Sequence, residues 1–148
     1  MITVRNTIDY PVAADDLWEA TMAYSALDRV MQGKVAFRGL PEGRPFQGQV
    51  IDLQVSLFGI LPWQAYRIEM VEFSETQRLM RSSEGGAGVT AWRHTSRVVD
   101  TGSGSQIVDK IEIEAGWRTP FVALFAKWMY RARHKPRVAL LREKGLLS

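Results

Sequence analysis

The stretch from Thr119 to Lys144, TPFVALFAKWMYRARHKPRVALLREK, decides the fold of this chain. Thr119 is a favourable helix cap and Pro120 suits the first helical position, where no backbone N–H is needed, so a helix is predicted to begin here. Apolar residues then recur at steps of three and four: Phe121, Leu124, Phe125, Trp128 and Ala132. A helix with such a broad apolar stripe needs a large surface to lie on. We expect the aromatic residues and Leu124 to face that surface.

Pro136 and a group of cations set the second half of this stretch apart. Inside a helix, Pro136 would remove a hydrogen bond and press on the carbonyl of Ala132, so we expect a kink there or a break before Val138. Between Lys127 and Lys144, seven cations accompany a single acid, Glu143. They are Lys127, Arg131, Arg133, Lys135, Arg137, Arg142 and Lys144. Two interpretations remain: a solvated outer face favoured by the helix dipole, or a surface for an anionic partner such as nucleic acid or lipid.

The composition is that of an ordinary globular protein, with 46% hydrophobic and 24% charged residues in a chain of 148. A chain of this length is expected to form one domain, residues 1–148. Cys is absent, which excludes disulfides, thiolate zinc sites and a Cys nucleophile. Residues 1–10 alternate polar and apolar side chains, which predicts a strand and not a signal peptide, and no apolar run predicts a membrane span. We therefore expect a cytoplasmic location.

The residues before Thr119 have the patterns of two short helices and several strands. A strand is predicted over 1–10, helices over 13–22 and 24–31, and further strands over 35–38, 51–57, 63–73, 77–81, 89–99 and 107–115. Strands in succession followed by one long helix favour an α+β fold. We expect a curved antiparallel sheet of about six to seven strands that wraps around the long C-terminal helix, with two short helices after the first strand.

Two connections between these strands have unusual composition. Residues 58–62, FGILP, are apolar at a turn, so they either pack on a neighbouring element or form an exposed lip. Residues 85–88, GGAG, lack the Lys-Ser/Thr ending of a phosphate loop and are interpreted as a flexible connector.

A family resemblance rests mainly on the last two strands. Residues 92–95, WRHT, and 107–112, IVDKIE, are similar to a Trp-x-His-Thr-His strand and an Asp-Arg-Val-x-Tyr strand in a bacterial ligand-binding SRPBCC family. Trp63 and residues 67–69 match an earlier strand of that family. The order of elements across nearly the whole chain resembles the helix-grip fold of the START-like (SRPBCC) superfamily, which includes polyketide cyclases, plant pathogenesis-related proteins and lipid-transfer domains. Ser96 stands where the family pattern has a second His, and Ile113 where it has an aromatic residue, and no catalytic residue is carried over.

A polar group is predicted on the inward face of these two strands. Trp92, His94 and Ser96 alternate along one strand and therefore project to one face. If the following hairpin turns near Gly102, His94 lies across from Ile111, and Asp109 lies opposite Ser96, within diagonal reach of His94. Such an Asp–His pair could orient a general base, or it could simply satisfy two polar groups in a β-rich core. The only other His is His134, so no metal site is expected.

Three hypotheses about function follow. The first is a carrier or sensor that holds a small hydrophobic molecule between the sheet and the C-terminal helix, since the helix-grip resemblance implies an apolar pocket there. Its ligand-binding residues would be Tyr66, Trp92, His94, Ser96, Asp109, Phe121, Phe125 and Trp128. The second is an enzyme resembling polyketide cyclases or dehydratases that uses His94 and Asp109 as an acid–base pair. The third is an interaction module whose basic helix makes a weak contact with an anionic surface, with nucleic acid less expected. We place the first hypothesis ahead and expect no cofactor.

Overall fold

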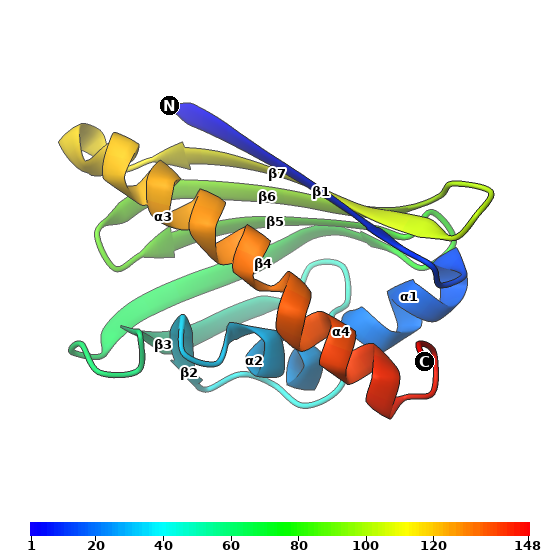
Figure 1. Ribbon diagram of the computed structural model, residues 1–148. Coiled ribbons are helices and arrows are strands. Elements are labelled where there is room, and N and C mark those ends of the chain that lie inside the picture. The colour runs from blue at the N-terminus through cyan, green and yellow to red at the C-terminus, as the bar shows by residue number, and fades with distance from the viewer.

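The computed structural model describes all residues from Met1 to Ser148 and has the predicted α+β architecture (Figure 1). The elements in chain order are β1 (Ile2–Tyr10), α1 (Ala14–Thr21), α2 (Tyr24–Met31), β2 (Val35–Arg38), β3 (Val50–Leu57), β4 (Gln64–Ser74), β5 (Leu79–Gly86), β6 (Val89–Asp100), β7 (Ser105–Glu114), the 3₁₀ helix η1 (Gly116–Arg118), α3 (Thr119–Ala132) and α4 (His134–Glu143). The expected helix-grip arrangement is confirmed: one curved sheet lies behind the C-terminal helices, and α1 and α2 close its lower side.

All seven strands form one antiparallel sheet in the order β1-β7-β6-β5-β4-β3-β2. The first strand pairs with the last, so the sheet's two edges are β1 and the short β2. In the β6–β7 hairpin, His94 pairs with Ile111 and Ser96 pairs with Asp109, which confirms the predicted register. Because side chains on a strand alternate between faces, this register puts His94, Ser96 and Asp109 on one face of the sheet.

The C-terminal stretch forms two helices that meet at Arg133, earlier than the predicted break before Val138. Pro136 explains the position, because its ring would clash with the carbonyl of Ala132, and α3 ends at that residue. In α4, Pro136 lies in the first turn, where its missing N–H costs no hydrogen bond. Thr119 is the first residue of α3 and not its cap: its hydroxyl donates to the carbonyl of Gly116 at 2.7 Å, across η1.

The predicted inward face of α3 is wrong. Phe121 and Leu124 are each 68% exposed and Trp128 is 47% exposed, so these side chains do not form the packed face. The buried residues of α3 are Thr119, Ala123, Ala126, Met129 and Tyr130. Ala123 and Ala126 give this face small side chains, which suits the close packing of α3 on β1, where Asn6 Nδ2 donates to the carbonyl of Tyr130 at 3.5 Å. The large side chains point away from that contact.

The core consists of two apolar clusters. The larger lies between the sheet, α2 and α3, and it includes Tyr24, Ile68, Trp92, Ile111 and Met129. The smaller joins α1 and α4 to the far ends of β6 and β7. Its main residues are Leu17, Trp18, Val98, Ile107 and Leu141. The two C-terminal helices therefore bury their apolar faces in different clusters.

The two unusual connections also take defined conformations. In the β3–β4 loop, Ile60 and Leu61 are exposed and form a lip, whereas Phe58 is exposed in part and also packs against Phe125 and Trp128 of α3. Gly85 and Gly86 belong to β5, and only Ala87 and Gly88 form the turn to β6, so the interpretation as a flexible connector is wrong. Gly86 has φ of +119°, and a Cβ there would lie 2.3 Å from the carbonyl oxygen of Ala65 in β4. Glycine is required at Gly86 because neighbouring backbone approaches so closely.

Candidate functional site

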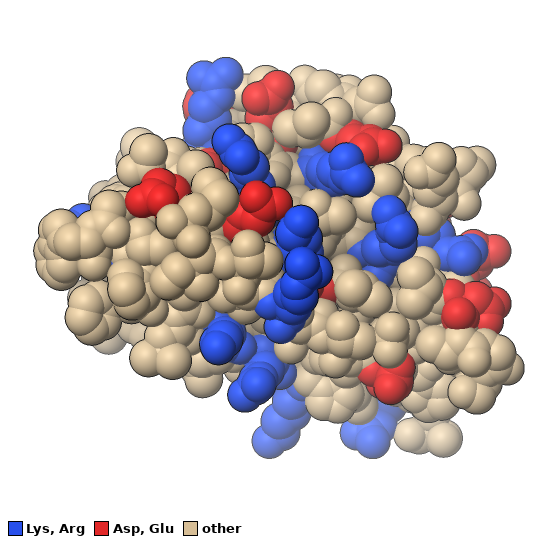
Figure 2. Space-filling model, turned by 90° about the horizontal axis from the view of Figure 1, so that it is seen from above, with Lys and Arg blue, Asp and Glu red and all other residues tan.

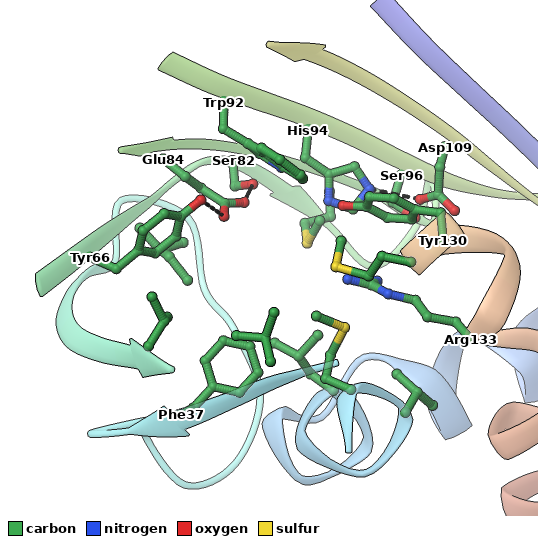
Figure 3. A pocket seen from close by; sticks show the side chains of 18 of the residues that line it. Phe37, Tyr66, Ser82, Glu84, Trp92, His94, Ser96, Asp109, Tyr130 and Arg133 are labelled. Atoms are coloured by element: carbon green, nitrogen blue, oxygen red, sulfur yellow. Dashed lines mark hydrogen bonds and ion pairs between the residues drawn. The ribbon is translucent and has the colours of Figure 1, made fainter. Parts of the chain in front are cut away.

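A cavity of about 630 Å³ lies between the concave face of the sheet, α2 and the C-terminal helices (Figure 3). Of its 36 lining residues, 26 are hydrophobic, and they come from every strand from β2 to β7. The volume lies within the range of roughly 300 to 1,000 Å³ that is usual for small-molecule sites. The cavity therefore has the size and lining of a site for an apolar small molecule.

The cavity reaches the surface beside the start of α3. Trp117 and Phe121 both line it and are strongly exposed, and Phe125 lines it next to them. Phe58 of the β3–β4 loop lies against Phe125 with ring centroids 5.9 Å apart. We call the exposed apolar side chains at this end the apolar collar: Phe58, Ile60, Leu61, Trp117, Phe121, Leu124 and Trp128. Figure 2 shows the corresponding left-hand end of the molecule as mostly uncharged.

His94 and Asp109 form a buried pair on the sheet side of the cavity. His94 Nε2 lies 2.7 Å from Asp109 Oδ1, and both side chains are buried. An ionised carboxylate can only accept, so Nε2 must donate, which leaves Nδ1 without a proton in the neutral imidazole. Tyr130 covers the imidazole, with its ring edge-on at 5.1 Å between centroids. Ser96 is buried beside the pair and also lines the cavity.

Several interactions compete to set the charge of Asp109. Burial disfavours the carboxylate and by itself would raise the pKa of Asp109. The hydrogen bond from His94 and electrostatic attraction by His94, Arg137 and Arg133 outweigh burial, so the pKa of Asp109 lies below its ordinary value. Asp109 is therefore ionised at neutral pH and holds the imidazole of His94 in one orientation.

A second polar group occupies the other end of the cavity, as Figure 3 shows. Tyr66 of β4 donates its hydroxyl proton to Glu84 Oε1 at 3.0 Å, and Ser82 donates to Glu84 Oε2 at 2.5 Å. Burial and the adjacent Glu84 carboxylate raise the pKa of Tyr66 well above its ordinary value, so Tyr66 remains a donor. These bonds satisfy Glu84 inside an otherwise apolar wall.

The third polar feature of the cavity is cationic. Arg133, at the junction of α3 and α4, is only 9% exposed, and Arg137 of α4 is 6% exposed; both line the cavity. Arg137 donates from Nη1 to the hydroxyl of Tyr10 at 3.2 Å. The Arg133 guanidinium lies over the ring of Tyr130, 4.2 Å from its centroid. The interpretation of the basic stretch as a uniformly solvated face is thus wrong at these two positions.

The structure brings most of the predicted ligand-binding residues to one cavity. Those that line it are Tyr66, Trp92, His94, Ser96, Asp109, Phe121 and Phe125. Trp128 does not line it; its ring contacts Phe58 and Phe125 on the outer side, at 6.1 and 5.8 Å between centroids. The prediction for Trp128 is wrong because α3 packs on the sheet through Ala123 and Ala126, which leaves Trp128 on the side that faces solvent.

Sequence reasoning missed Glu84, Ser82, Arg133 and Arg137. Ser82 and Glu84 continue the two-residue alternation that Met80 begins, so the signal was present, but the predicted strand ended at residue 81. Arg133 and Arg137 continue the face of Ala126 and Tyr130 at helical spacing. Their charge favoured an outward placement, and only the position of that face in the fold reveals that they are buried.

The structure holds no group of three or more His, Cys, Asp or Glu side chains that could bind a metal ion. None of its helices is long and apolar enough to cross a membrane.

Solved structures share this fold at low sequence identity. Protein CV1439 from Chromobacterium violaceum is 15% identical with a TM-score of 0.73, over 93% of this chain and 95% of that chain. Norcoclaurine synthase from Thalictrum flavum, solved in complex with dopamine and hydroxybenzaldehyde, is 19% identical with a TM-score of 0.66, over 96% and 87%. Ara h 8.0201 is 12% identical with a TM-score of 0.66, over 93% and 98%. This likeness shows the helix-grip (SRPBCC) fold.

Curated proteins show no significant match to this sequence. One family model does match, over residues 13–141, which includes the helices, the cavity walls and both buried arginines. The chain therefore belongs to the family described as a domain of unknown function, DUF8410.

Proposed function

We propose that residues 1–148 act as one domain that binds a small hydrophobic molecule in the cavity between the sheet and the C-terminal helices, as a carrier or sensor. The observation that carries this proposal is the cavity itself, about 630 Å³ in volume with 26 hydrophobic residues among the 36 that line it. Burial of an apolar molecule contributes roughly 25 cal/mol per Å² of apolar surface removed from water. The few polar groups at the two ends of the cavity would orient the molecule.

Two further features support this proposal. Trp117 and Phe121 of the apolar collar are exposed and line the cavity, so an incoming apolar molecule would meet apolar side chains there. The similar norcoclaurine synthase was solved with two small aromatic molecules bound. The WRHT sequence on β6 and the IVDKIE sequence on β7 also resemble the bacterial ligand-binding branch of the SRPBCC superfamily.

Binding can be tested with a pair of variants on β3. Val55 is buried and lines the cavity, whereas Val50, on the same strand, is exposed and outside it. We expect Val55→Phe to weaken the binding of Nile red, a neutral fluorescent dye, by about tenfold or more, because the added ring occupies ligand space. Val50→Phe should bind like the parent. Equal binding by all three folded proteins, checked by circular dichroism, would place the dye elsewhere.

A second candidate function is acid–base catalysis at His94, favoured by its 2.7 Å hydrogen bond to Asp109. The carboxylate would hold the imidazole in one tautomer and orientation, and Nδ1 would take up the substrate's proton. Native mass spectrometry of the purified protein would identify a co-purified molecule, which can then be incubated with the parent and with His94→Gln. A general base predicts a loss of turnover of about 10²- to 10⁴-fold with binding retained. We expect instead no conversion by the parent and only a modest change in affinity.

A further inference from the structure

The inner end of the cavity contains more buried positive charge than buried negative charge. Arg133 at the helix junction and Arg137 in α4 are buried and line the cavity there. A third buried cation, Lys34, which follows α2, lies outside the cavity lining. Asp109 is the only buried acid in the chain, and its carboxylate is hydrogen-bonded to His94. No ion pair joins Asp109 to any of the three cations, and Glu84 is bonded to Tyr66 and Ser82 at the other end. Burying unpaired charge is costly, so this excess calls for a compensating anion.

The three cations differ in how well the protein satisfies them. Lys34 Nζ donates to the carbonyl of Val30 at 3.0 Å, and burial together with the charge of Arg133 lowers the pKa of Lys34. Arg137 donates to the hydroxyl of Tyr10. The Arg133 side chain makes no hydrogen bond or ion pair, and only its stacking on Tyr130 holds it. The Nε atoms of both arginines are buried without a partner.

Arg133 is also directed toward the ligand space. Figure 3 shows its guanidinium extending from the helix junction into the cavity, below Tyr130 and the His94–Asp109 pair. A guanidinium is charged at all accessible pH values and presents paired N–H donors that match the two oxygens of a carboxylate. The surrounding wall is apolar, which would strengthen such a pair relative to water.

We propose that Arg133, supported by Arg137, binds the carboxylate of an amphipathic ligand whose apolar body fills the rest of the cavity. This inference rests on the proposed binding function and specifies its ligand class: a hydrophobic monocarboxylic acid. The bound carboxylate would neutralise part of the excess charge and accept hydrogen bonds from Arg133. The apolar body would extend along the hydrophobic wall toward the apolar collar.

The test compares three probes with the same ten-carbon chain: decanoic acid, 1-decanol and decylamine. Each displaces Nile red from the parent at pH 7.5, where the acid is ionised. We expect the acid to bind about tenfold tighter than the alcohol or more, and the amine to bind weakest, because only the acid complements Arg133. Equal affinities for acid and alcohol would overturn the inference and leave the proposed function standing. Failure of Nile red and all three probes to bind would contradict the proposed function itself.

Variants then assign the preference to one residue. Arg133→Gln should reduce the affinity for decanoic acid about tenfold while leaving that for 1-decanol unchanged. Arg131→Gln is the matched control, because Arg131 lies two residues earlier, in the last turn of α3, and is exposed. An equal loss for acid and alcohol in Arg133→Gln, or the same loss in Arg131→Gln, would contradict a specific role for Arg133. The comparison of probes on the parent decides the ligand class even if a variant does not fold.

Discussion

At the scale of single residues, most polar groups in the cavity have hydrogen-bond partners in the protein, and one does not. His94 satisfies Asp109, and Tyr66 and Ser82 satisfy Glu84, so these groups can remain buried without a ligand. The side chain of Arg133 has no hydrogen-bonding partner in the protein. This contrast separates side chains that stabilise the wall from one that is available to a ligand.

The His94–Asp109 pair predicts a specific dependence of stability on pH. Because the pKa of Asp109 is lowered in the folded state, its contribution to stability is fully present above the ordinary pKa of 3.8 and is lost as pH falls through the lower folded value. Asp109→Asn removes the charge, so it should cost about 3–5 kcal/mol at pH 7. The difference from the parent should shrink below pH 4.

Urea denaturation of both proteins between pH 7 and pH 2.5 measures this difference, with the exposed Asp52→Asn as control. A gap between parent and Asp109→Asn that stays constant down to pH 2.5 would show that the carboxylate is not stabilised by its neighbours.

At the scale of elements, the division of the C-terminal stretch into α3 and α4 positions the site. The junction at Arg133 places this residue at the cavity, and α4 then packs on α1 and α2. The apolar face of α4 enters the second core cluster through Leu141, whereas the large side chains of α3 remain in the apolar collar. The buried Leu141 of α4 is therefore expected to contribute more to stability than the exposed Leu124 of α3.

Two leucines test this difference with the same substitution. Leu141 is fully buried among Leu17 and Trp18, and Leu124 is 68% exposed. Leu141→Ala should lower the free energy of unfolding by about 2–5 kcal/mol, because it removes buried methyl groups and leaves a cavity. Leu124→Ala should change it by less than about 1 kcal/mol. Chemical denaturation gives both values, and similar losses for the two would mean that α3 packs through its large side chains after all.

At the scale of the whole molecule, charge and apolar surface are distributed unevenly. The basic stretch of α3 and α4 is the source of the net charge of +3. Arg133 and Arg137 of that stretch are nevertheless buried. Glu143 is paired with Arg29 of α2, which ties α4 to the rest of the fold. Lys and Arg side chains run down the middle of the face in Figure 2 with acidic side chains beside them, and the left-hand end of the molecule is mostly uncharged.

We expect only weak contact with anionic surfaces for this reason. In vesicle sedimentation, binding to vesicles rich in phosphatidylserine should be slight at physiological ionic strength and should fall further as salt is added, because exposed charges are screened within about 8 Å. Zwitterionic vesicles should bind less still. Tight binding to both vesicle types that does not weaken with added salt would instead indicate that the apolar collar inserts into the membrane. That result would favour an interaction module over a carrier or sensor.

The sequence by itself determined the order and type of the elements, the curved antiparallel sheet and the pairing of His94 and Asp109 on adjacent strands. These features depend on local patterns: alternation along β6 and β7, the turn near Gly102, and the effect of Pro136 on the residue four before it. Such patterns act within a few residues, so they can be read without knowing the fold.

Only the tertiary structure decided which face of α3 is buried and which charges are inside. Phe121 and Trp128 are more apolar than Ala123 and Ala126, so hydrophobicity favoured the wrong face. The close approach of α3 to β1 places the small side chains of Ala123 and Ala126 in the buried face, and Tyr130, Arg133 and Arg137 then line the cavity. Steric fit between elements distant in sequence therefore outweighed the apolar pattern, and it created the cationic end of the cavity.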